Sequence, residues 1–440
     1  MGIRHELHLQ KQGEKYLKPP ASYTLSPKEI EGFLNFVKSV KFPDGYAANI
    51  SRSVHIRNGK LMGLKSHDCH VLLQRILPLG FRGCLNKDVH DALSDLSRFF
   101  RILCAKTLRL DVLEKLEDMI INTICRFEMI FPPAFFDIMV HLVIHLPREA
   151  RLAVPAQYRN LSVLKGNVRN KARPEGSIAE AYIVNETLTF CSRYLRGMKS
   201  RNNQDEESND EVHLHENQLS IFSRRIHPFG QPLFTTLSWS EYNLVRWYVL
   251  NNSEELKSYL CEHENELRKE YSFIQNVATK QKEHFPLWFE QRIKNLKLHG
   301  SLEGKEDLYS LAMGPDIRVN VYSGCIVNGI KFLVNQRDIR RVTQNSGVSV
   351  QGSHKDESID FYGILTDVVD LSYIDGNHVV LFKCKWFDLE HKKTIIIDDD
   401  FTSINISKTW YDNDPYVLAG QVTQVFYVQD TKLRGDWHVV

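Results

Sequence analysis

The sequence predicts an α+β protein with a mainly helical bundle domain, an acidic linker, a short helical segment and a C-terminal domain that is mainly antiparallel β. Apolar residues recur every three or four positions through residues 64–195, which is the period of helices that bury one face. Residues 196–217 lose these apolar positions and become rich in Ser, Asn, Asp and Glu. Short β-branched and aromatic runs, joined by Asn-Gly and Asp-Gly pairs, fill residues 316–440.

Length and composition are those of a folded protein without strong net charge. At about 100–200 residues per domain, a chain of 440 residues is expected to form two or three domains. The hydrophobic share of 42% is that of an ordinary globular chain. Because the formal net charge is only +2, no chain-wide field would hold the protein on nucleic acid or an anionic membrane. Such binding requires a local basic patch.

The helical domain, residues 64–195, contains two amphipathic stripes. The first lies in residues 89–104 and comprises Val89, Leu93, Leu96, Phe100 and Leu103. The second comprises Leu113, Leu116, Ile120, Ile124 and Phe127. Asp111, with Glu114 three residues later, is the predicted N-cap of the second helix. Pro132-Pro133 is predicted to end that helix and to start the next, because proline is excluded from helix interiors and favoured in the first turn.

The stretch RNNQDEESNDE lies within residues 196–217, which are predicted to be a disordered linker. Such a stretch cannot bury enough apolar surface to offset the entropy of ordering. Residues 218–300 are predicted to be a helical connector. Ser253 is the expected cap of a helix that runs to Glu270, and the run FPLWF at residues 285–289 leads into a basic helix that ends near Lys297.

The β domain is predicted from two hairpins. Asn328-Gly329 separates two β runs, and Asp375-Gly376 separates residues 364–373 from residues 379–387. Both central residues of a type I′ turn need positive φ, which Asn, Asp and Gly tolerate. The domain is expected to be a small barrel or sandwich. Its aromatic residues fit a stacking platform or a core, and the alternation in residues 425–428 favours the core. They are Trp386, Trp410, Tyr411, Tyr416, Phe426, Tyr427 and Trp437.

The densest group of reactive side chains is KSHDCH at residues 65–70. On the helix expected after Pro133, Asp137, His141 and His145 are spaced four residues apart and share one face. Brought together, the two groups could hold zinc through imidazole and thiolate ligands. The candidate ligands are His67, Cys69, His70, His141 and His145. Neither HExxH nor CxxC occurs, so histidines that hydrogen-bond inside a polar helix interface are the favoured interpretation.

The best basic patch runs from residue 148 to residue 173 and meets only Glu149 as an acid. It could contact phosphates, with Tyr158 as a stacking partner, and its affinity would then fall steeply with salt. A charge run of this length is also typical of a solvated loop. The candidate nucleic-acid-binding residues are Arg148, Arg151, Arg159, Lys165, Arg169, Lys171 and Arg173.

Other chemistries have less support in the sequence. A nuclease would need Asp68, Glu128 and Asp137 around paired metal ions, but acids on helices are usually solvated or ion-paired. Ser66 beside His67 lacks the strained G-x-S-x-G elbow of hydrolases. No small-molecule substrate is evident, and no cofactor is expected beyond the zinc considered above.

The sequence predicts an intracellular protein that does not enter a membrane. The eight cysteines are scattered without a CxxC pair, as is typical of free thiols in a reducing compartment. Residues 1–15 are polar and charged, unlike a signal peptide. The longest apolar run, around residues 135–146, contains an aspartate and two histidines and is far shorter than the roughly 20 residues that span a bilayer.

Long ordered strings of this chain resemble a known family. LKSHDCHVLLQRILPLGFRG, CRFEMIFPPAFFDIMVHLVIHLPRE and LKGNVRNKARPEGSIAEAYIVNETLTFCSRYL look like the helical domain of unknown function that follows the catalytic core of plant En/Spm-like (CACTA) transposases. WYVLNNSEELKSYLCEHENEL and HFPLWFEQRI resemble the segment after that domain. FYGILTDVVDLSY, VVLFKCKWFD and DPYVLAGQVTQVFYVQD resemble the β-rich domain of unknown function that ends those proteins. Together the strings cover most of the chain from about residue 45.

The resemblance implies a nuclear, transposon-derived protein that binds DNA or partner transposase chains. The core of that family cuts and joins DNA with carboxylate-held magnesium, and residues 1–63 resemble only what is left of that region, beginning with IRHELHLQKQGEK. We therefore expect a truncated product without catalytic activity. The aromatic-rich segment that the family carries between VPAQYRN and VLKGNVRN is missing between Asn160 and Val163, which could remove a helix from the bundle.

Two alternatives stay open at the level of the sequence. One is a metal-dependent nuclease or transposase that uses His67, Asp68, His70, Asp137, His141 and His145. The other is a decayed element product without activity.

Overall fold

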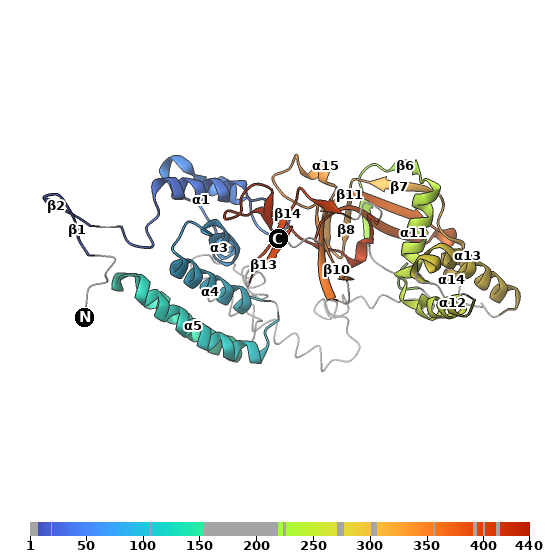
Figure 1. The fold of residues 1–440 in the computed structure, drawn as a ribbon, viewed down its shortest axis with the longest axis horizontal. Coiled ribbons are helices and arrows are strands. Elements are labelled where there is room, and N and C mark those ends of the chain that lie inside the picture. The colour runs from blue at the N-terminus through green and yellow to red at the C-terminus, as the bar shows by residue number, and fades with distance from the viewer. Residues whose placement is uncertain are drawn as a thin grey trace, which may run out of the picture. The chain divides into compact units, whose positions relative to one another are not determined.

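The computed structural model describes residues 8–18, 20–105, 107–153, 219–222, 226–270, 277–300, 306–354, 357–389, 394–398, 401–410 and 414–440. The chain divides into two compact units, residues 1–39 with 50–212 and residues 40–49 with 213–440. The predicted α+β class, with helices first and antiparallel sheets last, is confirmed (Figure 1). The predicted linker, residues 196–217, lies outside the described residues. Within the described ranges, no helix has the length and apolar character needed to cross a bilayer.

The first unit is mainly helical. Its described elements are β1 (Gln10–Gln12), β2 (Lys15–Leu17), α1 (Pro27–Ser39), β3 (Val54–His55), β4 (Lys60–Leu61), α2 (Ser66–Val71), a π-helical turn (Leu72–Ile76), α3 (Leu77–Gly80), α4 (Lys87–Leu103), α5 (Leu110–Ile130), α6 (Ile138–Leu142) and α7 (Leu146–Ala153).

Helices α4 and α5 form the core of this unit. The predicted stripe on α5 is confirmed, because all five of its residues are buried. On α4 the prediction is only partly right: Val89 is buried, but Phe99 is fully buried while Phe100 is half-buried. The reason is that α4 packs against α5 on one side and against α3 and the π-helical turn on another. Because α4 has neighbours on two sides, its buried surface is wider than a single stripe of residues.

One predicted N-cap is wrong, and the other is right in position only. Helix α5 begins at Leu110, so Asp111 lies inside its first turn, where the carboxylate accepts a hydrogen bond from the Arg109 guanidinium at 2.9 Å. Ser253 is the N-cap residue of the 3₁₀ turn (Glu254–Leu256) that leads into α12, which ends at Glu270 as predicted. Its hydroxyl donates to the Val249 carbonyl at 2.8 Å and forms no side-chain cap.

The helix expected to start at Pro133 starts later. Pro133 opens only a short 3₁₀ turn (Pro133–Phe135), and α6 begins at Ile138. Its true cap is Asp137, whose Oδ1 accepts hydrogen bonds from the backbone N–H of Met139 at 2.9 Å and Val140 at 3.1 Å. A second 3₁₀ turn (Val143–His145) then separates α6 from α7. The proline pair therefore ends α5 but does not start a continuous helix.

The second unit combines helices with three antiparallel sheets. Its described elements are β5 (Ile226–Phe229), β6 (Leu233–Thr236), α11 (Trp239–Asn251), α12 (Lys257–Glu270), α13 (Val277–Leu298), α14 (Glu306–Met313), β7 (Arg318–Tyr322), β8 (Gly324–Val327), β9 (Ile330–Leu333), α15 (Asn335–Asp338), β10 (Gly347–His354), β11 (Glu357–Ser372), β12 (His378–Phe387), β13 (Ile395–Ile397), β14 (Thr402–Asn405), β15 (Thr409–Trp410), β16 (Tyr416–Leu418), β17 (Thr423–Gln424), β18 (Val428–Gln429) and β19 (Trp437–Val439).

The large sheet is built around β11. One edge of β11 pairs with β12, with a register shift between Leu365 and Asp367, and the other edge pairs with β10 and then with β7. β6 pairs with β7, while β16 and β15 pair with β12. A small sheet, β5-β8-β9, and a four-stranded sheet, β13-β14-β19-β18, complete the unit. The sequence left a small barrel and a sandwich open, and the packed sheets correspond to the sandwich. Helices form a further layer on the large sheet.

Both predicted hairpin turns are confirmed. Asn328 and Gly329 have φ of 50° and 79° between β8 and β9. Asp375 and Gly376 have φ of 62° and 75° between β11 and β12. These positive φ values are what Asn-Gly and Asp-Gly were expected to supply.

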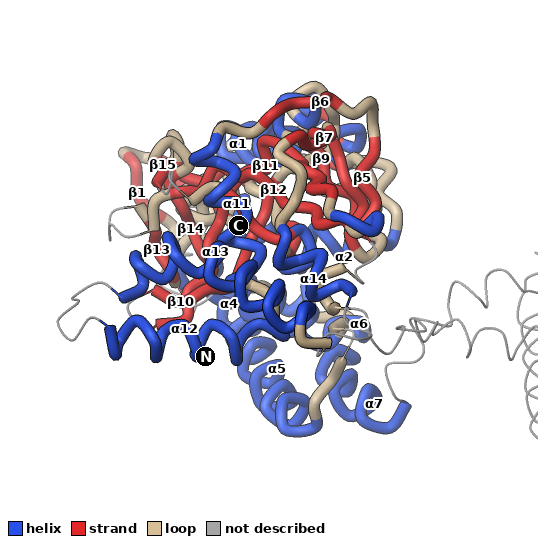
Figure 2. The backbone as a smooth tube through the Cα atoms, turned by 90° about the vertical axis from the view of Figure 1, so that its right-hand side faces the viewer, coloured by secondary structure: helices blue, strands red, loops and turns tan. Residues whose placement is uncertain are grey.

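The large sheet is buried on both faces. Val369, Leu371 and Leu381 pack under α11, α13 and α14, whose own core residues include Val245, Phe285 and Phe289. Figure 2 shows these helices in front of the strands. On the opposite face, Val368, Val380 and Phe382 pack against Cys325, Val327 and Phe332 of the small sheet. The predicted connector, residues 218–300, thus shares one core with the sheet.

Most of the aromatic residues in the β region contribute to packing. Trp386, Tyr416 and Tyr427 are buried, and the Tyr427 hydroxyl donates to the Gly363 carbonyl at 2.7 Å. Phe426 and Trp437 are half-buried, and Trp410 is 46% exposed. Tyr411 lies outside the described residues. The core interpretation therefore holds for the three buried rings.

Residues 40–49 belong to the second unit although their chain neighbours on both sides belong to the first. Phe42 is 3% exposed, and its ring meets Phe426 edge-on at 5.6 Å. The backbone N–H of Gln344 donates to the Phe42 carbonyl at 3.0 Å, and Asp44 forms a 2.9 Å ion pair with Lys331. From the sequence, residues 1–63 are expected to form a single segment, but residues 40–49 within it belong to a different unit from the rest.

Truncation of Phe382 should show how far the second unit depends on the packing between its sheets. Phe382→Ala should lower the free energy of unfolding by about 3–5 kcal/mol, because the ring is fully buried between the large and small sheets. Ile397→Ala, at a side chain that is 73% exposed, should change it by less than about 0.5 kcal/mol. All six tryptophans lie in the second unit, so urea unfolding followed by tryptophan fluorescence reports on this unit. Equal effects of the two variants would contradict the layered core.

Acid should weaken the second unit through His263. Burial lowers the pKa of this imidazole below its ordinary value of 6.5, so the unfolded chain binds the proton more readily. As pH falls below 6.5, the free energy of unfolding should drop by up to about 1.4 kcal/mol per pH unit until the folded-state pKa is reached. Urea titrations between pH 8 and pH 5 should show this drop in the natural chain and a smaller one in His263→Phe. Parallel pH profiles would rule the effect out.

Candidate nucleic-acid interface

The first group of candidate metal ligands lies on α2. The carboxylate of Asp68 is 7% exposed and accepts a hydrogen bond from the Lys65 backbone N–H at 2.9 Å. It therefore satisfies the N-terminus of its own helix. His67 and His70 lie on the same short helix, and Cys69 is exposed.

The second group lies on α6 and the turn that follows it. The His141 and His145 ring centroids are 5.2 Å apart, and Asp137 is used as the cap of α6. Across the described residues, no group of three or more His, Cys, Asp or Glu side chains is placed to hold a metal ion. The structure therefore does not gather His67, Cys69, His70, His141 and His145 into one ligand set, and the zinc site lacks geometric support.

Two of the three acids that a nuclease would need cap helices. Asp68 and Asp137 each accept backbone N–H groups at the start of a different helix. Such capping favours helix formation and explains both aspartates without a bound cation.

Only one end of the predicted basic patch is described. Arg148 and Arg151 lie on α7, and Arg151 Nη1 is 3.8 Å from Glu114 Oε1 in an exposed ion pair. Arg159, Lys165, Arg169, Lys171 and Arg173 lie outside the described residues.

The structure reveals a second basic element, the loop after α15 (Figure 1). Asp338, the last residue of α15, is 3% exposed. Its Oδ2 accepts hydrogen bonds from the backbone N–H groups of Asn345 at 2.6 Å and Ser346 at 2.9 Å. A buried carboxylate that receives two backbone donors holds both ends of the intervening loop in one geometry.

We call residues 339–342 the arginine loop. Its sequence is Ile-Arg-Arg-Val, with Ile339 66% and Val342 62% exposed. Arg340 is exposed and Arg341 half-buried, and neither forms an ion pair within the part of the chain that the structure describes. Two guanidinium groups on a held loop can each offer a planar fork of N–H donors to phosphate or carboxylate oxygens.

The segment of residues 40–49 supports this loop from one side. Asn345 Oδ1 accepts a hydrogen bond from the Asp44 N–H at 2.8 Å, next to the contact between Gln344 and Phe42. The hydrogen bond from Lys331 holds the pKa of Asp44 below its usual value, with a smaller contribution from the charge of Arg341. Asp44 is therefore an anion beside the loop and moderates its positive potential.

A second buried aspartate holds a second basic turn. Asp430 is 1% exposed, and its Oδ1 accepts hydrogen bonds from the N–H groups of Lys432 at 2.8 Å and Leu433 at 3.0 Å. Its Oδ2 accepts from the Ser403 hydroxyl at 2.7 Å. Lys432 and Arg434 on this turn are exposed. The same arrangement, a buried carboxylate that holds the backbone of a basic turn, thus occurs twice among the described residues of the unit.

Sequence reasoning missed both turns. For the arginine loop, the only sequence pattern that could have predicted a basic turn was short: an aspartate followed by two arginines and then by Asn-Ser-Gly. Patches of two charges are common on protein surfaces, so only the burial of Asp338 and Asp430 distinguishes these turns.

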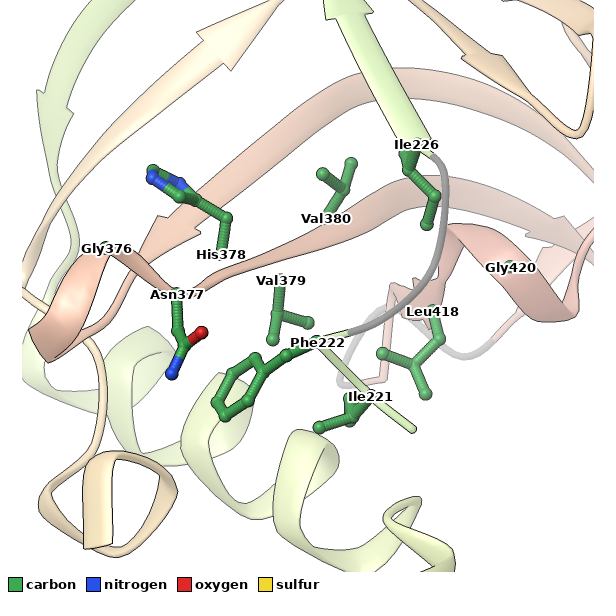
Figure 3. A pocket seen from close by; sticks show the side chains of 10 residues that line it. All are labelled: Ile221, Phe222, Ile226, Gly376, Asn377, His378, Val379, Val380, Leu418 and Gly420. Carbon is green, nitrogen blue, oxygen red and sulfur yellow. The ribbon is translucent and has the colours of Figure 1, made fainter. Parts of the chain in front are cut away.

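A cavity of about 260 Å³ at one end of β12 was also missed (Figure 3). Ile221, Phe222 and Val379 give it an apolar wall, and His378 lies at its edge with Nδ1 3.1 Å from Asp370 Oδ1. In Figure 3 the His378 ring points away from Ile221 and Phe222. The described residues that line the cavity include no hydroxyl or thiol, so among them the His378–Asp370 pair has no nucleophile to activate.

Two family models match the chain, and both are described as domains of unknown function. DUF4218 matches residues 103–209, and DUF4216 matches residues 369–440. This pair of domains is typical of plant transposase-derived proteins. The second match begins inside β11, so β7 to β10 and the covering helices lie before it. No curated protein and no solved structure matches the chain.

The hydrogen bonds to Asp338 can be tested without deleting the side chain. Asp338→Asn should lower the free energy of unfolding of the second unit by about 1–3 kcal/mol, because one oxygen that accepts two backbone N–H groups loses its charge or is replaced by a donor. Asp375→Asn is the matched control, since Asp375 lies in an exposed turn at φ 62°, which Asn tolerates. Urea titrations of both variants measure the difference, and equal stability would refute the anchoring role of Asp338.

Proposed function

We propose that this chain is a transposon-derived protein of the En/Spm-like (CACTA) kind that binds DNA in the nucleus, with the arginine loop as a contact to the phosphate backbone. Two features support the family part of the proposal: the ordered strings of the sequence and the pair of matched domains. The exposed Arg340 and the half-buried Arg341, on a loop that Asp338 holds, support the binding part.

The physical case for the arginine loop has two parts. Arginine side chains bind phosphate oxygens through charge-assisted hydrogen bonds, and each contact releases counterions from the duplex. A loop that is already held by Asp338 loses little conformational entropy on binding, so less of the interaction energy is spent on ordering.

The basic stretch of residues 148–173 would supply a second contact. It carries seven cations against one acid, which is a stronger local charge than the arginine loop has. Two basic elements on one chain would bind a long duplex more tightly than either alone. Partner transposase chains are the other expected ligand, through the same surfaces.

The proposal concerns binding and not strand cleavage, because the strings resemble the region downstream of the transposase core. The role of Asp68, beside His67 on the same helix, is then structural, because its carboxylate accepts the Lys65 N–H.

A fluorescence anisotropy titration with a labelled duplex of about 30 base pairs tests the proposal. Replacing Arg340 and Arg341 with Ala should weaken binding by roughly 10- to 100-fold at low salt and should reduce the slope of log affinity against log salt by about 2. Replacing Lys165, Arg169, Lys171 and Arg173 with Ala as well should reduce this salt slope further.

The matched control removes two arginines that are already neutralised. Arg292 pairs with Glu262 at 2.8 Å, and Arg318 pairs with Asp316 at 2.9 Å. Arg292→Ala with Arg318→Ala changes the net charge equally but should leave the salt slope nearly unchanged. If the control and the arginine-loop variant weaken binding alike, the loop is not a specific contact. If the natural chain shows no salt-dependent binding, the function is wrong.

A further inference from the structure

A second cavity lies in the helical layer, between α12 and α13, with a volume of about 370 Å³. The two helices pack side by side, joined by the hydrogen bond from Gln281 to the Leu260 carbonyl and by the Arg292–Glu262 ion pair. The cavity is lined by His263, Glu266, Leu267, Glu283, His284, Leu287, Trp288 and Gln291.

One lining side chain is buried without a hydrogen-bond partner. His263 is 3% exposed, and its Nδ1 meets no donor or acceptor among the described residues. The ring lies 5.0 Å from the Trp288 ring and 5.5 Å from the Phe285 ring, so it packs as an aromatic side chain. Burying such a nitrogen unpaired costs about 1–3 kcal/mol.

The charged side chains that line the cavity are acidic. They are Glu266 and Glu283, and no described lysine or arginine lines it. Glu266 Oε2 accepts a hydrogen bond from Trp288 Nε1 at 2.7 Å, which fixes the carboxylate against the indole. Glu283 lies 3.5 Å from Lys280, but this pair is exposed and binds weakly. Burial keeps His263 neutral near pH 7, so the cavity is rich in acceptors and negative.

We propose that this cavity binds a primary ammonium group carried on an aliphatic stem. An ammonium has three N–H donors, and the cavity offers three acceptors in the His263 imidazole and the carboxylates of Glu266 and Glu283. The Trp288 ring adds an attraction for a cation near its face. Leu267 and the 61% exposed Leu287 provide apolar contact for the methylene groups of the stem.

This site is independent of the proposed function, since a negative cavity repels the phosphates that the arginine loop would attract. The ammonium can come from the lysine side chain of another protein or from a free aliphatic diamine. Both sources share the same head group and stem, so the proposal names the chemistry and the experiment separates the sources.

The test uses the full chain with ¹⁵N-labelled tryptophan and follows the indole N–H signal of Trp288, identified with Trp288→Phe. Titration with n-butylammonium should shift this signal saturably, with a dissociation constant in the millimolar range. n-Butanol, which lacks the charge, and tetramethylammonium, which lacks N–H donors, should bind at least 10-fold more weakly. A lysine-containing peptide and 1,4-diaminobutane then show which source binds more tightly.

Three variants make the result specific. Glu266→Gln keeps an oxygen for the Trp288 N–H but removes the charge, and it should weaken n-butylammonium binding about 10-fold. His263→Phe keeps the ring packing and removes the imidazole nitrogens, with a similar loss expected. Glu264→Gln is the matched control, because Glu264 lies on the same helix, pairs with Arg268 and does not line the cavity.

Unchanged signals from the other five tryptophans show that each variant is folded. Affinity that is equal in Glu266→Gln and Glu264→Gln would overturn the proposal. Equal binding of butanol, or no saturable shift in the natural chain, would overturn it as well.

Discussion

Burial of both faces of the paired strands β11 and β12 is the constraint on which the rest of the second unit depends. Alternate residues of these strands point to opposite faces, so Val369 and Leu371 need a helical cover while Val368 and Val380 need the small sheet. A shift of register by one residue would exchange the two sets. The matched region that begins at residue 369 cuts through β11 and lacks the helices that cover it, so the unit that folds is larger than that region.

The second unit carries surface elements of opposite charge around this buried core. Asp338 and Asp430 are buried, and each receives backbone N–H groups from a basic turn. The α12–α13 pair instead presents carboxylates around a buried imidazole. The two kinds of surface suit different ligands, phosphate for the turns and an ammonium group for the cavity. A chain with almost no net charge can therefore still bind charged partners through local surfaces.

Predictability from sequence differed between elements for identifiable reasons. The two hairpin turns and the α5 stripe were predictable because they depend on residues close in sequence: positive φ at Asn328 and Asp375, and a repeat every three or four residues in α5. The cap at Asp111 was predicted wrongly because α5 begins at Leu110, whereas Ser253 occupies the predicted cap position with its hydroxyl bonded to the preceding turn. The metal ligands at His67 and His141 had suitable chemistry, but the structure does not bring them together within the described residues.

The sequence by itself determined the α+β class, the order of the helical and β regions, the hairpin turns and the resemblance to a transposon family. The fold class and the turns depend on local periodicity and turn chemistry, and the resemblance depends on ordered strings of residues that are similar to those of the family. Only the tertiary structure decided that residues 40–49 belong to the β unit, that the helices of residues 239–298 share its core, and that the buried Asp338 holds the backbone of Asn345 and Ser346. Those facts depend on contacts between residues far apart in the chain, such as Asp44 with Lys331, and local patterns carry no information about which distant residues meet.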